Sequence, residues 1–172
     1  GGIVQIRELH GFKLLNDLDP AMFKGALNPG GGTPLYDATM EAVDALFGYG
    51  QQLFKKKFMC NAILFILTDG DNNSSMTISD PTEIAKSIAR IRSESIVESF
   101  QSILIGVNDT DPMLKSYLEN FRKAAGIDEY VSIGDATAGK LAKLAQFVSQ
   151  SVSSCSQALG SGGPSQPISF KF

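Results

Sequence analysis

The densest group of oxygen-bearing side chains in the chain lies between Thr68 and Ser75, in the run Thr-Asp-Gly-Asp-Asn-Asn-Ser-Ser. Carboxylate, amide and hydroxyl oxygens are the ligands that hard cations such as Mg²⁺ and Ca²⁺ prefer. The same residue types also form turns in which aspartates accept hydrogen bonds from local backbone amides. Taken alone, the run is better explained as such a turn, and cation binding needs support from elsewhere in the chain.

A second group lies earlier in the chain, where Gly30, Gly31 and Gly32 precede Thr33 and Pro34. Thr33 is a good helix N-cap and Pro34 a good first helical residue, so a structural interpretation is available here too. Capping does not explain three consecutive glycines, however, whereas glycine lets the backbone approach a ligand closely.

Both groups lie next to elements that the residue pattern predicts. Four apolar runs are expected to be strands, and the last three are short and bounded by polar turns, as in a parallel sheet covered on both faces. Helix start signals such as Asp80-Pro81 and Asp111-Pro112 alternate with these runs. The expected strands are 3–9, 62–67, 102–107 and 130–133, and the expected helices are 21–27, one opening at Thr33-Pro34, one opening at Asp80-Pro81, 111–125 and 136–154.

The alternation of strands and helices predicts a doubly wound α/β sheet with its ligand sites at the carboxyl ends of the strands. With 172 residues, one domain is expected, over residues 1–159, followed by a Gly/Ser/Pro-rich tail at 160–172. The tail ends in Ile168–Phe172, which is apolar enough to dock as an added strand at a place that the sequence leaves open.

Composition limits the classes of function. The formal charge of −3 argues against a protein that mainly grips nucleic-acid phosphates, and no apolar run is long enough to span a membrane. Two cysteines and no signal-peptide pattern favour a reducing, cytoplasmic setting.

The two polar groups together resemble the von Willebrand factor type A (vWA) family. The resemblance rests on two motifs, Gly-Gly-Thr-Pro-Leu-Tyr-Asp-Ala at 31–38 and Ile-Leu-Phe-Ile-Leu-Thr-Asp-Gly at 63–70. It covers about residues 3–154. It implies a Rossmann-like, mostly parallel sheet with one antiparallel edge strand.

The resemblance also implies a metal-ion-dependent adhesion site that binds Mg²⁺, or Ca²⁺ or Mn²⁺. Thr33 and Asp69 match the family's metal ligands. Gly32, Asp37, Gly70 and Asp71 are expected to shape the loops or to orient water around the ion. The implied function is a protein–protein interaction module, not an enzyme, in which the ion binds an aspartate or glutamate carboxylate of a partner protein.

One part of the family's pattern is missing, because no Asp-x-Ser-x-Ser occurs in the chain. In the family this motif ends the first strand and supplies three of the metal's oxygen ligands. We therefore expect the 172 residues to lack the first strands of the domain, with a strand-helix-strand unit preceding Ile3, and we expect weak metal binding. A partner chain that supplies the missing strand is an alternative.

Two other functions stay open. A metal-free vWA scaffold could dock through its helices or its C-terminal tail. Alternatively, Gly134–Lys140 matches the G-x-x-x-x-G-K pattern of a phosphate-binding loop after a strand, which would suggest a nucleotide-dependent enzyme. Leu141 stands where that loop needs a hydroxyl for Mg²⁺, and a helix capped by Asp135 with an exposed lysine at its start explains the segment better.

Overall fold

The computed structural model describes residues 6–26 and 31–161. Their sheet has three parallel strands in the order β1-β2-β3, with residue 64 of β1 opposite residue 102 of β2. The bounds are Asn61–Thr68 for β1, Ser99–Gly106 for β2 and Glu129–Ser132 for β3. The α/β prediction is confirmed, and the strands expected at 62–67, 102–107 and 130–133 all form.

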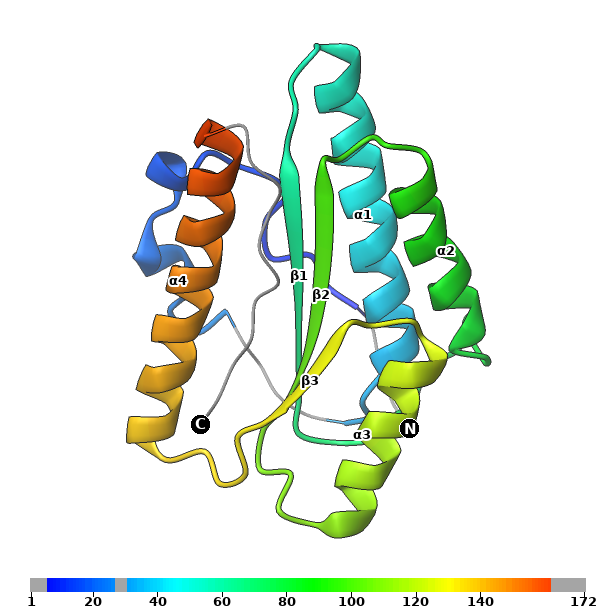
Figure 1. Ribbon diagram of the computed structural model, residues 1–172. Coiled ribbons are helices and arrows are strands. Elements are labelled where there is room, and N and C mark those ends of the chain that lie inside the picture. Colours follow the sequence, from blue (N-terminus) through cyan, green and yellow to red (C-terminus); the bar gives the residue numbers. More distant parts are fainter. Residues whose placement is uncertain (1–5, 27–30, 162–172) are drawn as a thin grey trace.

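Four α-helices cover the sheet, and they lie on two sides of it (Figure 1). Helices α1, α2 and α3 lie on one side, where Ile84 and Leu118 pack against Leu104 of β2. Helix α4 lies on the other side, where Phe147 packs against Ile103 and Ile105. The bounds are Leu35–Lys55 for α1, Thr82–Ser93 for α2, Pro112–Ala124 for α3 and Ala138–Ser161 for α4.

The N-terminal predictions are wrong where the structure describes them. Residues 6–9 of the expected strand 3–9 form no strand, and residues 1–5 lie outside the described part. In place of the helix expected at 21–27 there is a short 3₁₀ helix, Pro20–Phe23, after another at Leu15–Asp17. The side chains of this segment bury too little apolar surface to support regular structure, as the 79% exposure of Leu15 shows.

The expected antiparallel edge strand is also not found in the described residues, where every strand pairing is parallel. Among the same residues, no helix combines the length and the apolar character needed to cross a membrane.

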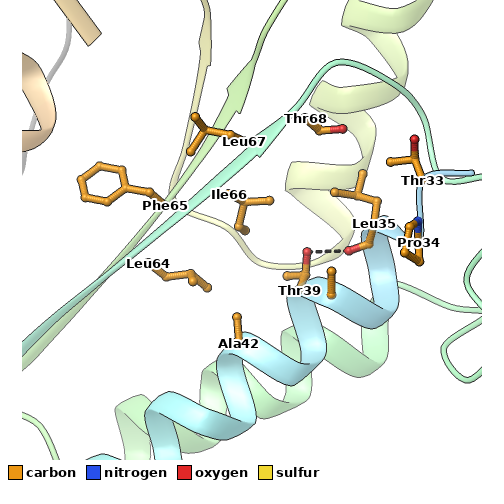
Figure 2. A pocket seen from close by; sticks show the side chains of 11 residues that line it. Thr33, Pro34, Leu35, Thr39, Ala42, Leu64, Phe65, Ile66, Leu67 and Thr68 are labelled. Atoms are coloured by element: carbon orange, nitrogen blue, oxygen red, sulfur yellow. Dashed lines mark hydrogen bonds between the residues drawn. The ribbon is translucent and has the colours of Figure 1, made fainter. Parts of the chain in front are cut away.

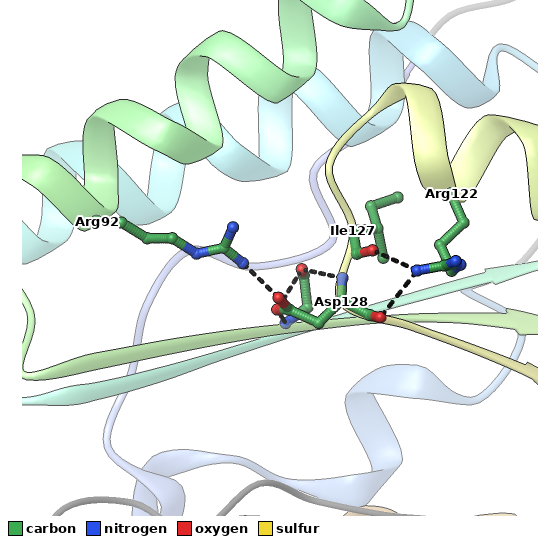
Figure 3. Close-up of polar contacts among 5 residues, drawn as sticks. Arg92, Arg122, Ile127 and Asp128 are labelled. Carbon is green, nitrogen blue, oxygen red and sulfur yellow. Dashed lines mark hydrogen bonds and ion pairs between the residues drawn. The ribbon is translucent and has the colours of Figure 1, made fainter.

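A polar cluster around Asp128 lies just before β3, beside the middle of β2 (Figure 3). Its carboxylate accepts hydrogen bonds from the backbone N–H and hydroxyl of Ser102, at 2.8 and 2.9 Å, and pairs with Arg92 at 2.7 Å. Arg122 donates to the carbonyl oxygens of Ile127 and Asp128 at 3.2 and 3.0 Å. These contacts hold the α3–β3 turn against β2 and α2. The charged groups of Arg92, Asp128 and Arg122 therefore serve contacts within the protein.

Core burial predicts the effect of truncating Leu104, which is 0% exposed. Leu104→Ala should lower the free energy of unfolding by about 2–5 kcal/mol, because it leaves a cavity between β2 and the helices. The matched control Leu15→Ala removes the same atoms from an exposed site and should change stability by less than about 0.5 kcal/mol. Urea denaturation measures both, and equal effects would contradict the position of β2 at the centre of the core.

Candidate functional site

Two loops meet at the carboxyl end of β1, the one before α1 and the one after β1. Asn73 N donates a hydrogen bond to Thr33 O at 3.1 Å, and Thr33 N donates to Asn73 Oδ1 at 2.6 Å. Parallel strands bring the loops that follow them to one edge of the sheet, and this reciprocal pair then joins the start of α1 to that edge. The structure thus brings together the two sequence segments that carry the resemblance.

Glycine is required for this approach at Gly32 but not at Gly70. A Cβ atom on Gly32 would lie only 2.6 Å from Ser74 Cβ, and a Cβ on Gly70 would lie 3.4 Å from the Thr33 hydroxyl oxygen. Gly32 therefore has no room for a side chain, while the Thr33 hydroxyl lies beside the backbone of the residue that follows Asp69.

The Thr33 hydroxyl and the Asp69 carboxylate are free of internal hydrogen bonds to the described residues. The alternative interpretation of Thr33 as the N-cap of α1 is wrong, because the helix begins at Leu35 after Pro34, without a side-chain cap. Asp69 is exposed at the end of the strand. Two oxygen-bearing side chains on the two joined loops are thus left without a hydrogen-bond partner in the described part of the chain.

Asp37 is bound differently from the other candidate residues. Its carboxylate accepts hydrogen bonds from the backbone N–H groups of Met76 and Ile78, both at 2.7 Å, and of Thr77 at 3.2 Å. Burial by itself would raise the pKa of Asp37, but these three N–H groups together lower it below its ordinary value. Asp37 acts as the anchor that holds the loop after β1 on the first turn of α1.

Two tyrosines brace the same loop. The hydroxyls of Tyr36 and Tyr117 lie 2.8 Å apart, and Asn72 N donates to the Tyr117 hydroxyl at 3.1 Å. Burial, and then the contact with Tyr117, raise the pKa of Tyr36 well above its ordinary value, so the Tyr36 hydroxyl keeps its proton at physiological pH. Sequence reasoning missed Tyr117, because it lies on α3 and only tertiary packing brings it to this loop.

The described residues contain no cluster of three or more histidine, cysteine, aspartate or glutamate side chains arranged for a metal ion. Asp71 is exposed on the same loop as Asp69, and Asp37 is occupied by backbone donors. The oxygens at this edge that form no hydrogen bond with a described residue therefore include the Thr33 hydroxyl, the Asp69 and Asp71 carboxylates and the buried Ser74 hydroxyl.

An apolar pocket of about 260 Å³ lies beside these loops (Figure 2). Its walls are residues 64–68 of β1 and the start of α1 from Thr33 to Ala42. Thr33 and Thr68 bring hydroxyls to one end of it, and the remainder is lined mainly by aliphatic side chains.

The segment Gly134–Lys140 is already occupied by internal contacts. Gly134 N donates to Asp109 Oδ1 and Ala136 N donates to Asn108 Oδ1, both at 2.9 Å, and the Lys140 ammonium pairs with the Asp135 carboxylate. A phosphate-binding loop needs these N–H groups and this ammonium for its ligand. The contacts support the structural interpretation of the segment.

Asp109 organises that part of the edge and was not singled out from the sequence. It is 0% exposed, and besides Gly134 its carboxylate accepts hydrogen bonds from the hydroxyls of Ser132, at 3.0 Å, and Tyr130. A carboxylate with three donors joins the loop after β2 to the loop after β3. An aspartate three residues after an apolar strand is the one sequence signal that could have indicated it.

No protein-family model, curated protein or solved structure matches this chain. The vWA resemblance therefore remains a prediction from the two motifs.

The Asp37 anchor predicts a measurable loss of stability. Asp37→Asn replaces an oxygen acceptor by an amide donor and should lower the free energy of unfolding by about 1–2 kcal/mol at neutral pH. Because the folded-state pKa of Asp37 is lowered, the wild-type advantage is present above the unfolded pKa, near 3.9, and fades as the pH falls through the lower folded value. Asp44→Asn, at an exposed position of α1, should change the free energy of unfolding little. An equal loss of stability in both variants, or a loss in Asp37→Asn that does not depend on pH, would contradict the role of Asp37 as an anchor.

The occupied segment 134–140 predicts that ATP does not raise the melting temperature through Lys140. At fixed Mg²⁺, wild-type protein and the Lys140→Ala variant should respond identically to ATP in a thermal shift assay. A rise that Lys140→Ala removes would restore the nucleotide-binding hypothesis.

Proposed function

We propose that this chain is a cation-dependent protein-binding module, in which Mg²⁺ held at Thr33 and Asp69 binds a carboxylate of a partner protein. The observation that carries the proposal is that the Thr33 hydroxyl and Asp69 lie on two joined loops with no internal partner among the described residues. Asp37 and Asn73, by contrast, are used to build the loops themselves.

The donors fit a weakly held ion. Mg²⁺ commonly takes one or two carboxylates from a protein and keeps several waters. Thr33 is neutral, so an ion bound to it and to the single negative charge of Asp69 retains a net positive charge. That charge, together with exchangeable water positions, favours an incoming aspartate or glutamate side chain over a neutral group.

Binding rather than catalysis is the better fit for this edge. The one histidine of the chain, His10, packs edge-on against Phe23 with ring centroids 5.3 Å apart, in the N-terminal segment. It is therefore held by a contact outside the two loops, and no histidine is available there as a general base.

A metal-free scaffold is the second candidate. It is favoured by the lack of a three-ligand acidic cluster among the described side chains. In that case Thr33 and Asp69 are ordinary surface groups, and the module docks through its helices or its tail.

A Mg²⁺ titration separates the two candidates. At Mg²⁺ concentrations of about ten times Kd, binding stabilises the protein by about 1.4 kcal/mol, which raises the melting temperature by about 3–5 °C. Thr33→Ala and Asp69→Ala should each abolish the rise, whereas Asp44→Asn, an exposed carboxylate of α1, should preserve it. Substituting Mn²⁺ should broaden the NMR amide signals of Thr33, Asp69 and Gly70 before all others.

Binding of a carboxylate to the proposed Mg²⁺ ion can be measured separately from binding of the ion itself. Isotope-labelled acetate, a minimal partner carboxylate, should shift its NMR signal with the Mg²⁺-loaded protein and not with the Asp69→Ala variant. No effect of Mg²⁺ on the melting temperature would favour the metal-free scaffold, and Mg²⁺ binding without acetate binding would remove the proposed route to a partner.

A further inference from the structure

One edge of strand β1 has no pairing partner among the described residues, and it is called the open edge below. The strand pairs with β2 on its other side, where Val107 N donates to Thr68 O at 2.8 Å and Glu98 N donates to Cys60 O at 2.8 Å. Successive residues of a strand direct their N–H and C=O groups to alternate sides. The groups of Ile63, Phe65 and Leu67 therefore face away from β2, and no described residue pairs with them.

This edge lacks the features that protect natural edge strands. Such strands usually carry a charged residue, a proline or a bulge that blocks pairing with another strand. The sequence of β1, Asn-Ala-Ile-Leu-Phe-Ile-Leu-Thr, has no charge and no proline, and its register with β2 is unbroken. A strand of this kind is typical of the interior of a sheet.

Space for apolar side chains lies directly beside the edge. Five consecutive residues of β1, 64–68, line the 260 Å³ pocket (Figure 2). Because alternate side chains of a strand point to opposite faces, the pocket must contact the edge of β1 as well as one of its faces. The opposite wall of the pocket, on α1, includes Ala38 and Ala42, whose small side chains leave space unfilled. The volume is many times the ~30 Å³ of a water molecule. On the other face of the sheet, Leu67 remains 55% exposed.

We propose that residues 168–172 at the C-terminus of this chain add a parallel strand to the open edge of β1. Their sequence, Ile-Ser-Phe-Lys-Phe, alternates apolar and polar residues as a half-buried strand does. Ile168, Phe170 and Phe172 would share one face and fill apolar space beside β1, while Ser169 and Lys171 would share the other.

The reach of the chain allows this pairing and sets its direction. Cys155 O accepts a hydrogen bond from Asn61 Nδ2 at 3.0 Å, so α4 passes the amino end of β1 and ends at Ser161, about 9 Å further on. Residues 162–167 can span up to about 20 Å, enough to return to the start of β1. A strand that begins there must run toward the carboxyl end of β1 and is therefore parallel to it.

The topology gives the same result. Crossovers between parallel strands are almost always right-handed. Helices α2 and α3 cover one face of the sheet while the strand order advances from β1 to β3, and α4 covers the opposite face. A strand that follows α4 and pairs with the open edge of β1 requires the chain to cross back over the sheet, from β3 to beyond β1. This crossover runs opposite to the β1-β2-β3 order and passes over the opposite face. The two reversals cancel, so it has the same hand as the β1-α2-β2 crossover.

Hydrogen exchange of backbone amides in the full 172-residue chain tests the proposal, independently of the cation site. The amides of Ile63, Phe65 and Leu67 should exchange at least about tenfold more slowly than in a variant that ends at residue 167. The amides of Leu64 and Ile66, which face β2, should be unchanged and serve as the internal control. Adding a peptide of residues 162–172 to the shortened protein should restore the protection.

Point variants separate side-chain packing from chain length. Phe170→Asp should remove the protection of the three edge amides, whereas Lys171→Gln, on the other face of the same segment, should preserve it. If a variant fails to fold, NMR contacts in the unaltered chain decide instead: backbone protons of residues 63–67 should show contacts to those of 168–172.

Three results would overturn the proposal. Rapid exchange of the amides of Ile63, Phe65 and Leu67 in the full chain would show that none of the 172 residues pairs with this edge. Protection that survives loss of residues 168–172 would show that another segment occupies it. Protection that rises with protein concentration, together with a dimer in sedimentation, would assign the edge to a second copy.

Discussion

The burial of strand β2 on both faces is the constraint on which the rest of the molecule depends. Residues 102–106 are all buried, and a strand with no solvent-facing side requires helices above and below it. Helices α1, α2 and α3 meet this requirement on one face and α4 on the other. Because the three strands are parallel, the loops that follow them all emerge at one edge, and the sites considered for function lie there.

At that edge, most polar side chains serve the architecture. Asp37 binds three backbone N–H groups, Asn73 joins the two loops, and Asp109 connects the loops after β2 and β3. An oxygen-rich sequence is thus a poor measure of binding capacity, because buried or loop-forming donors are satisfied internally. The side chains of Thr33 and Asp69, like the buried hydroxyl of Ser74, form no such hydrogen bond with a described residue.

The two edges of β1 differ in the same way. Its inner edge is bonded to β2 along its whole length, whereas its outer edge and the adjoining pocket lack a partner in the described residues. The reach of the chain after α4 and the hand of the crossover make the chain's own last residues a candidate for this place. The proposed cation site and the proposed strand-binding edge lie at adjoining parts of β1 but depend on different atoms.

The sequence by itself determined the alternating elements with strong local signals. The apolar runs that became β1 and β2, and the helix start at Asp111-Pro112, were predictable because burial and capping leave a pattern along the chain. Residues 6–9 and 21–26 were mispredicted, since short segments form regular structure only when other elements bury them. Only the tertiary structure decided that Thr33 does not cap its helix, that Asp37 is committed to a distant loop and that Tyr117 contacts Asn72. These partners lie about 40 or more positions apart, and no local pattern encodes which distant donor a side chain will meet.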